Sequence, residues 1–144
     1  MTIFDEAMPA RTIALIEHYY AAFNAGDMDT FLGLLSETVV HDLNQGTREV
    51  GKAAFGAFMQ RMNRSYREQI ADITVMVNSD GTRAAAEYTV SGKYQITEAG
   101  LPAAWGQPYA LRGGAFFEVQ NDLITRVTNY YNLEEWVRQI DVAD

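Results

Sequence analysis

Residues 38–46 read Thr-Val-Val-His-Asp-Leu-Asn-Gln-Gly and place an imidazole, a carboxylate and an amide at the end of an apolar run. Burying ionisable side chains costs free energy, so a buried strand that carries them usually serves a site. The segment follows two expected helices and precedes a third, which puts its polar residues beside the space that helices and a sheet enclose. We therefore expect a ligand pocket next to this strand.

Amphipathic helices are expected on both sides of the strand. The first carries apolar residues at helical spacing and ends near Gly26. Asp27 is the expected cap of a short second helix. A third helix is predicted over residues 51–66 from apolar residues spaced three or four apart: Phe55, Phe58, Met59 and Met62.

After residue 67 the pattern alternates with a period of two, which predicts strands. We expect them over residues 70–78, 83–97, 109–120 and 123–131. Asn132 is the expected cap of a last helix over residues 133–140. This order predicts a single α+β domain over residues 1–144, with a curved, mostly antiparallel sheet wrapped around three N-terminal helices and a short C-terminal helix. Small residues on the inner face would leave room for a ligand: Ala84, Ala86, Gly92 and Ala115.

Composition argues against several classes of function. The net charge of −8 and the pI near 4.7 disfavour nucleic acid and anionic membranes as partners. The chain has no cysteine, which excludes thiolate catalysis and cysteine-based zinc sites. No apolar run reaches membrane-spanning length, and the first ten residues lack the pattern of a signal peptide, so we expect a soluble, cytoplasmic protein. The only histidines, His18 and His41, do not have the spacing of a metal site, so we expect neither metal nor cofactor.

The order of elements resembles the nuclear transport factor 2-like superfamily, the cone-shaped, cystatin-like fold of ketosteroid isomerase and the polyketide cyclases. Residues 19–27, Tyr-Tyr-Ala-Ala-Phe-Asn-Ala-Gly-Asp, are similar to the first helix of the isomerase and its exit, and Val40-His41-Asp42 resembles the strand that carries its general base. Residues 49–67 and 114–132 look most like the bacterial ketosteroid isomerase-related group. The superfamily holds isomerases, cyclases, hydratases, hydrolases and non-catalytic binders, so the fold alone does not define an activity.

The resemblance implies a proton-transfer site. In ketosteroid isomerase, an Asp moves a proton next to a carbonyl while a Tyr and a protonated Asp hold the oxyanion. The resemblance maps the base onto Asp42 and the tyrosine donor onto Tyr19. The position of the second donor falls on Gly114 or Ala115, neither of which carries an acid, and this loss makes true steroid isomerase activity doubtful.

Asn129 is the expected replacement for that second donor. It shares a strand face with Tyr131, and the resemblance points this face inward, where the amide could donate to an oxyanion. The alternative is that the amide only satisfies neighbouring backbone groups.

Neighbouring strand residues point to opposite faces, so only one of His41 and Asp42 enters the pocket unless the strand bulges. We assign Asp42 to the pocket, with Asn44 on its side, because a desolvated carboxylate is a stronger base. The alternative for Asp42 is a hydrogen-bonded carboxylate at the strand end. His41 is expected to pack under a helix or at a subunit contact, or to pair with Asp42 across a bulge. The predicted ligand-contacting residues are His41, Asn44, Tyr88, Tyr94, Trp105, Phe117 and Tyr131.

We therefore predict a cofactor-free isomerase, cyclase or dehydratase that moves a proton next to a carbonyl in a small apolar ligand. One alternative is a non-catalytic module that binds a small molecule or a partner. Another is a hydrolase that uses a water activated by Asp42, which would need a second acid at Asp72 or Glu118. The resemblance also implies a homodimer formed through the open face of the sheet.

Overall fold

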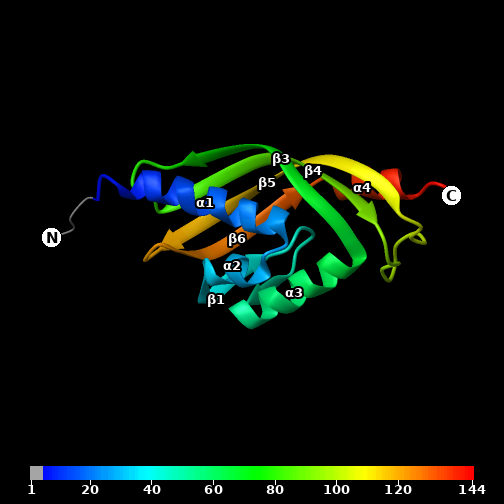
Figure 1. Ribbon diagram of the computed structural model, residues 1–144, viewed down its shortest axis with the longest axis horizontal. Helices are drawn as coiled ribbons and strands as arrows, with labels where there is room; N and C mark the ends of the chain where they lie inside the picture. Colours follow the sequence, from blue (N-terminus) through cyan, green and yellow to red (C-terminus); the bar gives the residue numbers. More distant parts are fainter. Residues whose placement is uncertain (1–4) are drawn as a thin grey trace.

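The computed structural model describes residues 5–144, and its elements follow the expected order (Figure 1). The helices are α1 (Met8–Ala25), α2 (Met28–Gly33), α3 (Lys52–Ser65) and α4 (Leu133–Ile140). The strands are β1 (Leu35–Asp42), β2 (Arg48–Val50), β3 (Tyr66–Val77), β4 (Arg83–Tyr94), β5 (Gln107–Gln120) and β6 (Leu123–Tyr131). Among the described residues, no helix is both long and apolar enough to cross a membrane.

The predicted helix ends are confirmed and have local causes. Gly26 ends α1 in the left-handed conformation, with φ of 70°, which glycine adopts without steric cost. The side chains of Asp27 and Asn132 accept hydrogen bonds from backbone N–H groups in the first turns of α2 and α4. The sequence pattern predicts strands over residues 38–43 and from residue 70, whereas β1 begins at Leu35 and β3 at Tyr66, and it misses the short strand β2.

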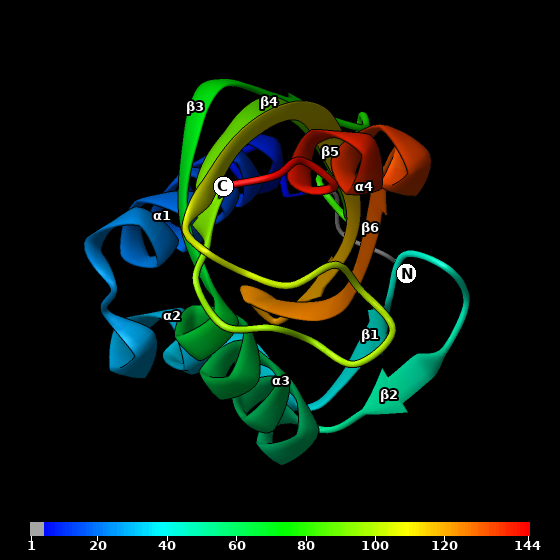
Figure 2. The ribbon, with the colours of Figure 1, turned by 90° about the vertical axis from the view of Figure 1, so that its right-hand side faces the viewer.

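The six strands form one sheet in the order β2-β1-β6-β5-β4-β3. All neighbours are antiparallel except β1 and β6, which run parallel and make the sheet mixed. Figure 2 shows the sheet curling from β3 through β4, β5 and β6 to β1, with α1, α2 and α3 on its open side. The predicted α+β fold with a curved sheet around the N-terminal helices is confirmed.

The core lies where the inner face of the sheet meets α1 and α2. Phe117 of β5 is fully buried, and its ring centroid lies 5.4 Å from that of Tyr19 on α1. Phe31 of α2, also fully buried, lies 4.5 Å from the same tyrosine ring. Burying a large apolar side chain contributes about 1.5–3 kcal/mol, so this aromatic cluster fixes α1 and α2 on the sheet.

Candidate functional site

A cavity of about 560 Å³ lies between the inner face of the sheet and helices α1 and α3. Pockets of roughly 300–1,000 Å³ with apolar walls and few polar groups are typical of small-molecule sites. Most of its lining is aromatic or aliphatic, from Tyr20 and Phe23 of α1 to Phe58 and Met62 of α3. The polar residues on its walls include His41, Asn129 and Glu68.

At the end of β1, His41 faces the cavity and Asp42 faces the opposite side of the sheet. Pairing with β2 runs without interruption from Val40 to Asp42, so no bulge brings the two side chains together. His41 lines the cavity, whereas Asp42 lines a separate hollow of about 280 Å³ on the outer face. The prediction that Asp42 enters the pocket is wrong: the register of β1 against its neighbours turns His41 inward, and alternation then places Asp42 on the outer face.

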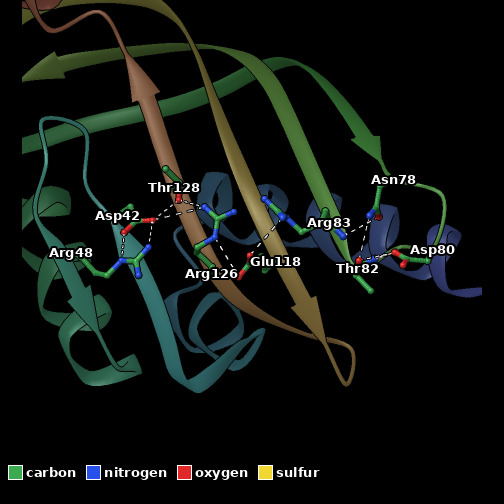
Figure 3. Close-up of polar contacts among 9 residues, drawn as sticks. All are labelled: Asp42, Arg48, Asn78, Asp80, Thr82, Arg83, Glu118, Arg126 and Thr128. Atoms are coloured by element: carbon green, nitrogen blue, oxygen red, sulfur yellow. Dashed lines mark hydrogen bonds and ion pairs between the residues drawn. The ribbon is translucent and has the colours of Figure 1, made fainter. Parts of the chain in front are cut away.

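The carboxylate of Asp42 is held by partners on the outer face (Figure 3). Nε of Arg48 donates to one oxygen at 2.6 Å, and Nη2 donates to the other at 3.1 Å. The hydroxyl of Thr128 donates to the same carboxylate at 2.7 Å. These hydrogen bonds, led by that of Arg48, hold the pKa of Asp42 below its ordinary value, which is the reverse of the raised pKa expected for a desolvated base.

The hydrolase alternative is not supported, because none of the acids it needs lies in the cavity lining. Asp42 cannot activate a water in the cavity from the other side of the sheet, and its role is that of a hydrogen-bonded carboxylate at the strand end. Asp72 is exposed at an irregularity of β3, with φ of 53°. Glu118 lies on the outer face with Asp42, between Arg126 and Arg83, at 3.4 and 3.7 Å (Figure 3).

His41 packs beneath α3, which confirms one of the positions expected for it. Its ring stacks on Phe55 with centroids 4.0 Å apart and planes 13° from parallel, and Phe58 meets it edge-on at 4.8 Å. The residue is only 1% exposed. Burial lowers the pKa of His41 to about 4, against a smaller opposing effect of Asp42, so the imidazole is neutral at pH 7.

The two ring nitrogens of His41 have different surroundings. Nε2 lies 3.3 Å from the amide nitrogen of Asn129 on β6. Because an amide nitrogen only donates, Nε2 accepts and the neutral ring carries its proton on Nδ1. Nδ1 is buried and has no hydrogen-bond partner among residues 5–144, and its nearest acid, Glu49 of β2, has an equally unpartnered oxygen 4.0 Å away. The structure therefore places His41 and Asn129 together at the cavity wall, with the carboxylate of Glu49 on the Nδ1 side of the ring and outside the cavity lining.

Several other predicted residues also line this cavity: Tyr19, Asn44, Tyr88 and Tyr131. Burial raises the pKa of Tyr88 to about 12 and raises the pKa of Tyr19 further, so both hydroxyls keep their protons and can donate. The side-chain amide of Asn44 donates to the backbone carbonyl of Tyr131 at 3.0 Å and ties the end of β6 to the loop after β1.

The structure places three of the predicted ligand-contacting residues outside the cavity lining, where their side chains have structural roles. Tyr94 is buried, and its hydroxyl donates to the carbonyl of Pro102 and accepts from the N–H of Glu98, which fixes the loop between β4 and β5. The indole of Trp105 donates to the carbonyl of Val142 near the C-terminus. Phe117 belongs to the aromatic core. None of the three is among the residues that line the cavity.

Like Glu98, Glu68 is an acid that lines the cavity, and sequence reasoning missed it. The hydroxyl of Tyr109 donates to its Oε2 at 2.7 Å. Burial raises the pKa of Glu68, and the hydrogen bond from Tyr109 partly opposes the rise. The signal was present, because extending the period of two backward from Ile70 puts Glu68 and Tyr66 on the same inner face. Within residues 5–144, no group of three or more His, Asp or Glu side chains is placed to hold a metal ion.

Comparison with known proteins gives a consistent family signal. The model of the SnoaL-like domain matches residues 16–127. A crystal structure named "putative polyketide cyclase", from Xanthomonas campestris pv. campestris, is 58% identical with a TM-score of 0.90, over 92% of this chain and 98% of that one. A protein of the same name from Pseudomonas putida is 60% identical with a TM-score of 0.88, over 90% of this chain and 97% of that one.

A more distant structure shares the fold alone. The LEH-like epoxide hydrolase from M. tuberculosis is 16% identical with a TM-score of 0.74, over 92% of this chain and 86% of that one. No curated protein matches the chain.

Proposed function

Because the chain belongs to the SnoaL-like family, we propose that it is a cofactor-free isomerase, cyclase or dehydratase that moves a proton next to a carbonyl in a small, largely apolar ligand. One observation carries the proposal: the neutral imidazole of His41 and the amide of Asn129 meet at the wall of an apolar cavity. A base and a hydrogen-bond donor within reach of one point are the minimum that this chemistry needs.

His41 acts as the base in this proposal. When the ligand binds, the Asn129 amide donates to the ligand's carbonyl oxygen instead of to Nε2, which frees the Nε2 lone pair. Nε2 then takes a proton from the carbon next to that carbonyl, and the electron pair of the C–H bond moves to the carbonyl oxygen, giving an enolate. The amide of Asn129 and the hydroxyl of Tyr19 donate to the enolate oxygen, and Glu49 balances the charge of the imidazolium through Nδ1. The pKa of about 4 leaves His41 free of the proton at neutral pH, as the base of ketosteroid isomerase also is.

The fate of the enolate distinguishes an isomerase from a cyclase. Returning the proton to another carbon gives an isomer, whereas attack of the enolate carbon on a second carbonyl of the same ligand closes a ring. The polyketide cyclase name of two structures that are 58% and 60% identical supports the ring-closing direction.

Solvent exchange with 2-tetralone tests the proposal, since its C–H groups next to the carbonyl exchange with D₂O only through an enolate. We expect the protein to accelerate exchange, followed by NMR, and His41→Gln to remove about a hundredfold or more of that acceleration. His18→Gln is the matched control, because His18 is exposed on α1. Tetralone binding without any acceleration would overturn the proposal and favour the non-catalytic binding module.

We also propose a homodimer formed through the outer face of the sheet, where Phe116 is 48% and Tyr130 is 57% exposed. Their rings stack edge-on with centroids 5.8 Å apart, which gives the face an apolar centre. Light scattering should give twice the chain mass for the protein and a lower mass for Phe116→Asp; an unchanged mass would contradict the proposal. The cytoplasmic location remains a proposal as well, tested by cell fractionation.

A further inference from the structure

A polar contact spans three strands on the inner face of the sheet. Gly92 of β4 pairs with Glu68 of β3 on one side and with Tyr109 of β5 on the other. Because Gly92 has no side chain, the ring of Tyr109 lies across β4 and its hydroxyl reaches the carboxylate two strands away, at 2.7 Å. A Cβ at position 92 would overlap that hydroxyl and the ring carbon that bears it.

The hydrogen bonds of Glu68 are incomplete. A carboxylate has about four lone-pair sites, and Oε2 receives the Tyr109 hydroxyl. Among residues 5–144, no donor meets the other oxygen, and neither Lys nor Arg pairs with this carboxylate. Because Glu68 is half-buried, its free oxygen is an acceptor that further donors would stabilise.

The open side of Glu68 faces the cavity rather than bulk solvent. Glu68 lines the cavity wall with Tyr66, Ile70 and Tyr88. Tyr109 behind it is 5% exposed, so the carboxylate is held from a rigid, buried side chain. A donor group on a molecule that fills the cavity can therefore reach this oxygen.

Glu68 also lies far from His41 in the order of the sheet. Glu68 belongs to the edge strand β3, and His41 belongs to β1 near the opposite edge, yet both line the same cavity. The curl of the sheet seen in Figure 2 brings these two edges around one space. A ligand in the cavity thus meets a carboxylate on one wall and the His41–Asn129 pair on another.

We propose that Glu68, held by Tyr109 through the gap at Gly92, is a binding subsite for a hydroxyl or N–H donor group of the ligand. The inference rests on the proposed function, since it takes the cavity as the ligand site and leaves the proton transfer to His41. It adds a chemical requirement: the ligand carries a hydrogen-bond donor on the part that faces β3, away from the reacting carbonyl.

Two probes of nearly equal shape test this subsite. 2-Naphthol has one hydroxyl donor, and 2-methoxynaphthalene has the same ring system without a donor. By fluorescence titration at pH 7, we expect the protein to bind 2-naphthol about tenfold more tightly, because a hydrogen bond to a charged acceptor is strong. Glu68→Gln keeps the shape and removes the charge, so we expect the preference to fall to about threefold or less.

Glu87→Gln is the matched control, because the Glu87 side chain is 63% exposed and lies outside the cavity lining. It should keep the preference of the unchanged protein. A second measurement, on the unchanged protein, complements the fluorescence titration. The chemical shift of the Glu68 carboxyl ¹³C should change on adding 2-naphthol and stay unchanged on adding 2-methoxynaphthalene. An equal affinity for both probes, or an unchanged preference in Glu68→Gln, would overturn the subsite.

The two proposals fail separately. If His41→Gln abolishes tetralone exchange while Glu68→Gln leaves the naphthol preference intact, the proton-transfer site stands and the Glu68 subsite falls. If the naphthol preference depends on Glu68 but no exchange occurs, the subsite stands in a binding protein.

Discussion

His41 and Asp42 are neighbours on one strand and have opposite surroundings. His41 is buried against the rings of α3, and its Nδ1 lacks a partner among the described residues. Asp42 is on the outer face and is held by Arg48 and Thr128. The pKa of each side chain is lowered, but burial removes the charge from the imidazole whereas a guanidinium stabilises the charge of the carboxylate.

This contrast shows that the sign of a pKa shift does not identify a site. The paired carboxylate has little reason to react, since its charge is already compensated. The neutral imidazole has an uncompensated nitrogen and lies next to space that a ligand can fill. Geometry relative to the cavity therefore separates the candidate base from the structural ion pair.

The largest expected difference between the two faces is in packing. Phe117→Ala removes a fully buried ring and should lower the free energy of unfolding by about 3–5 kcal/mol in urea denaturation. Phe116→Ala, at a position 48% exposed on the outer face, should cost less than about 1 kcal/mol in the free chain. A larger loss of unfolding free energy for Phe116→Ala that depends on protein concentration would indicate the proposed dimer. Equal losses for the two variants, without that dependence, would contradict the assignment of the two residues to opposite faces.

The next difference is in the response to pH. The usual histidine pKa of 6.5 falls to about 4 at His41, so the unfolded chain binds this proton at a higher pH than the folded chain does. The free energy of unfolding should therefore drop as the pH falls from about 6.5 to about 4, by up to about 3.5 kcal/mol at 1.4 kcal/mol per pKa unit.

Replacing the imidazole isolates this contribution. Urea denaturation at a series of pH values should show a flatter profile for His41→Gln than for the unchanged protein, while His18→Gln keeps the original slope. If His41→Gln left the pH dependence of the free energy of unfolding in this window unchanged, the contrast drawn between His41 and Asp42 would be wrong.

A smaller effect is expected at the other member of the pair. Asp42→Asn removes the charge that Arg48 binds and should lower the free energy of unfolding by about 1 kcal/mol at low salt, with the loss shrinking as salt is added. The lowered pKa of Asp42 gives stability that is present above its unfolded pKa and disappears as acid protonates it in the folded chain. A loss of tetralone exchange in Asp42→Asn as large as that in His41→Gln would instead restore Asp42 as the base.

The smallest effect is expected further along the outer face. Glu118 lies 3.4 Å from Arg126 and 3.7 Å from Arg83, and its side chain is 43% exposed. Such exposed pairs contribute little, so Glu118→Gln should change the thermal unfolding midpoint by an amount equivalent to about 0.5 kcal/mol or less. A change above about 1.5 kcal/mol would show that the charges in Figure 3 act as a cooperative network.

Most of the fold could be predicted from local signals. The strand over residues 123–131 and the helix over residues 133–140 were placed at their observed ends, because a turn at Asn121-Asp122 and a cap at Asn132 mark them. The short β2 was missed because three residues carry no period. The parallel pairing of β1 with β6 depends on contacts between distant parts of the chain, which local patterns do not contain.

The site was predictable only in part. Alternation correctly separated His41 from Asp42, but choosing which of the two faces inward required the register of β1 against its neighbours. Tyr94 and Phe117 do lie on the inner face, yet they pack in the core or hold a loop, and a periodic pattern cannot distinguish a filled part of that face from an empty one. Glu68 was missed because the strand predicted from the sequence begins at residue 70, whereas β3 begins at Tyr66.

The gap at Gly92 also makes the Glu68–Tyr109 contact a check on how the strands are aligned. If β4 slipped by two residues against both neighbours, each side chain would keep its face, but Val90 or Tyr94 would occupy the position between the tyrosine and the glutamate. Either side chain would block the hydroxyl from the carboxylate. A sheet in the shifted register would thus keep its apolar core but lose this hydrogen bond. The contact therefore favours one register of the three strands over others that bury the same apolar side chains.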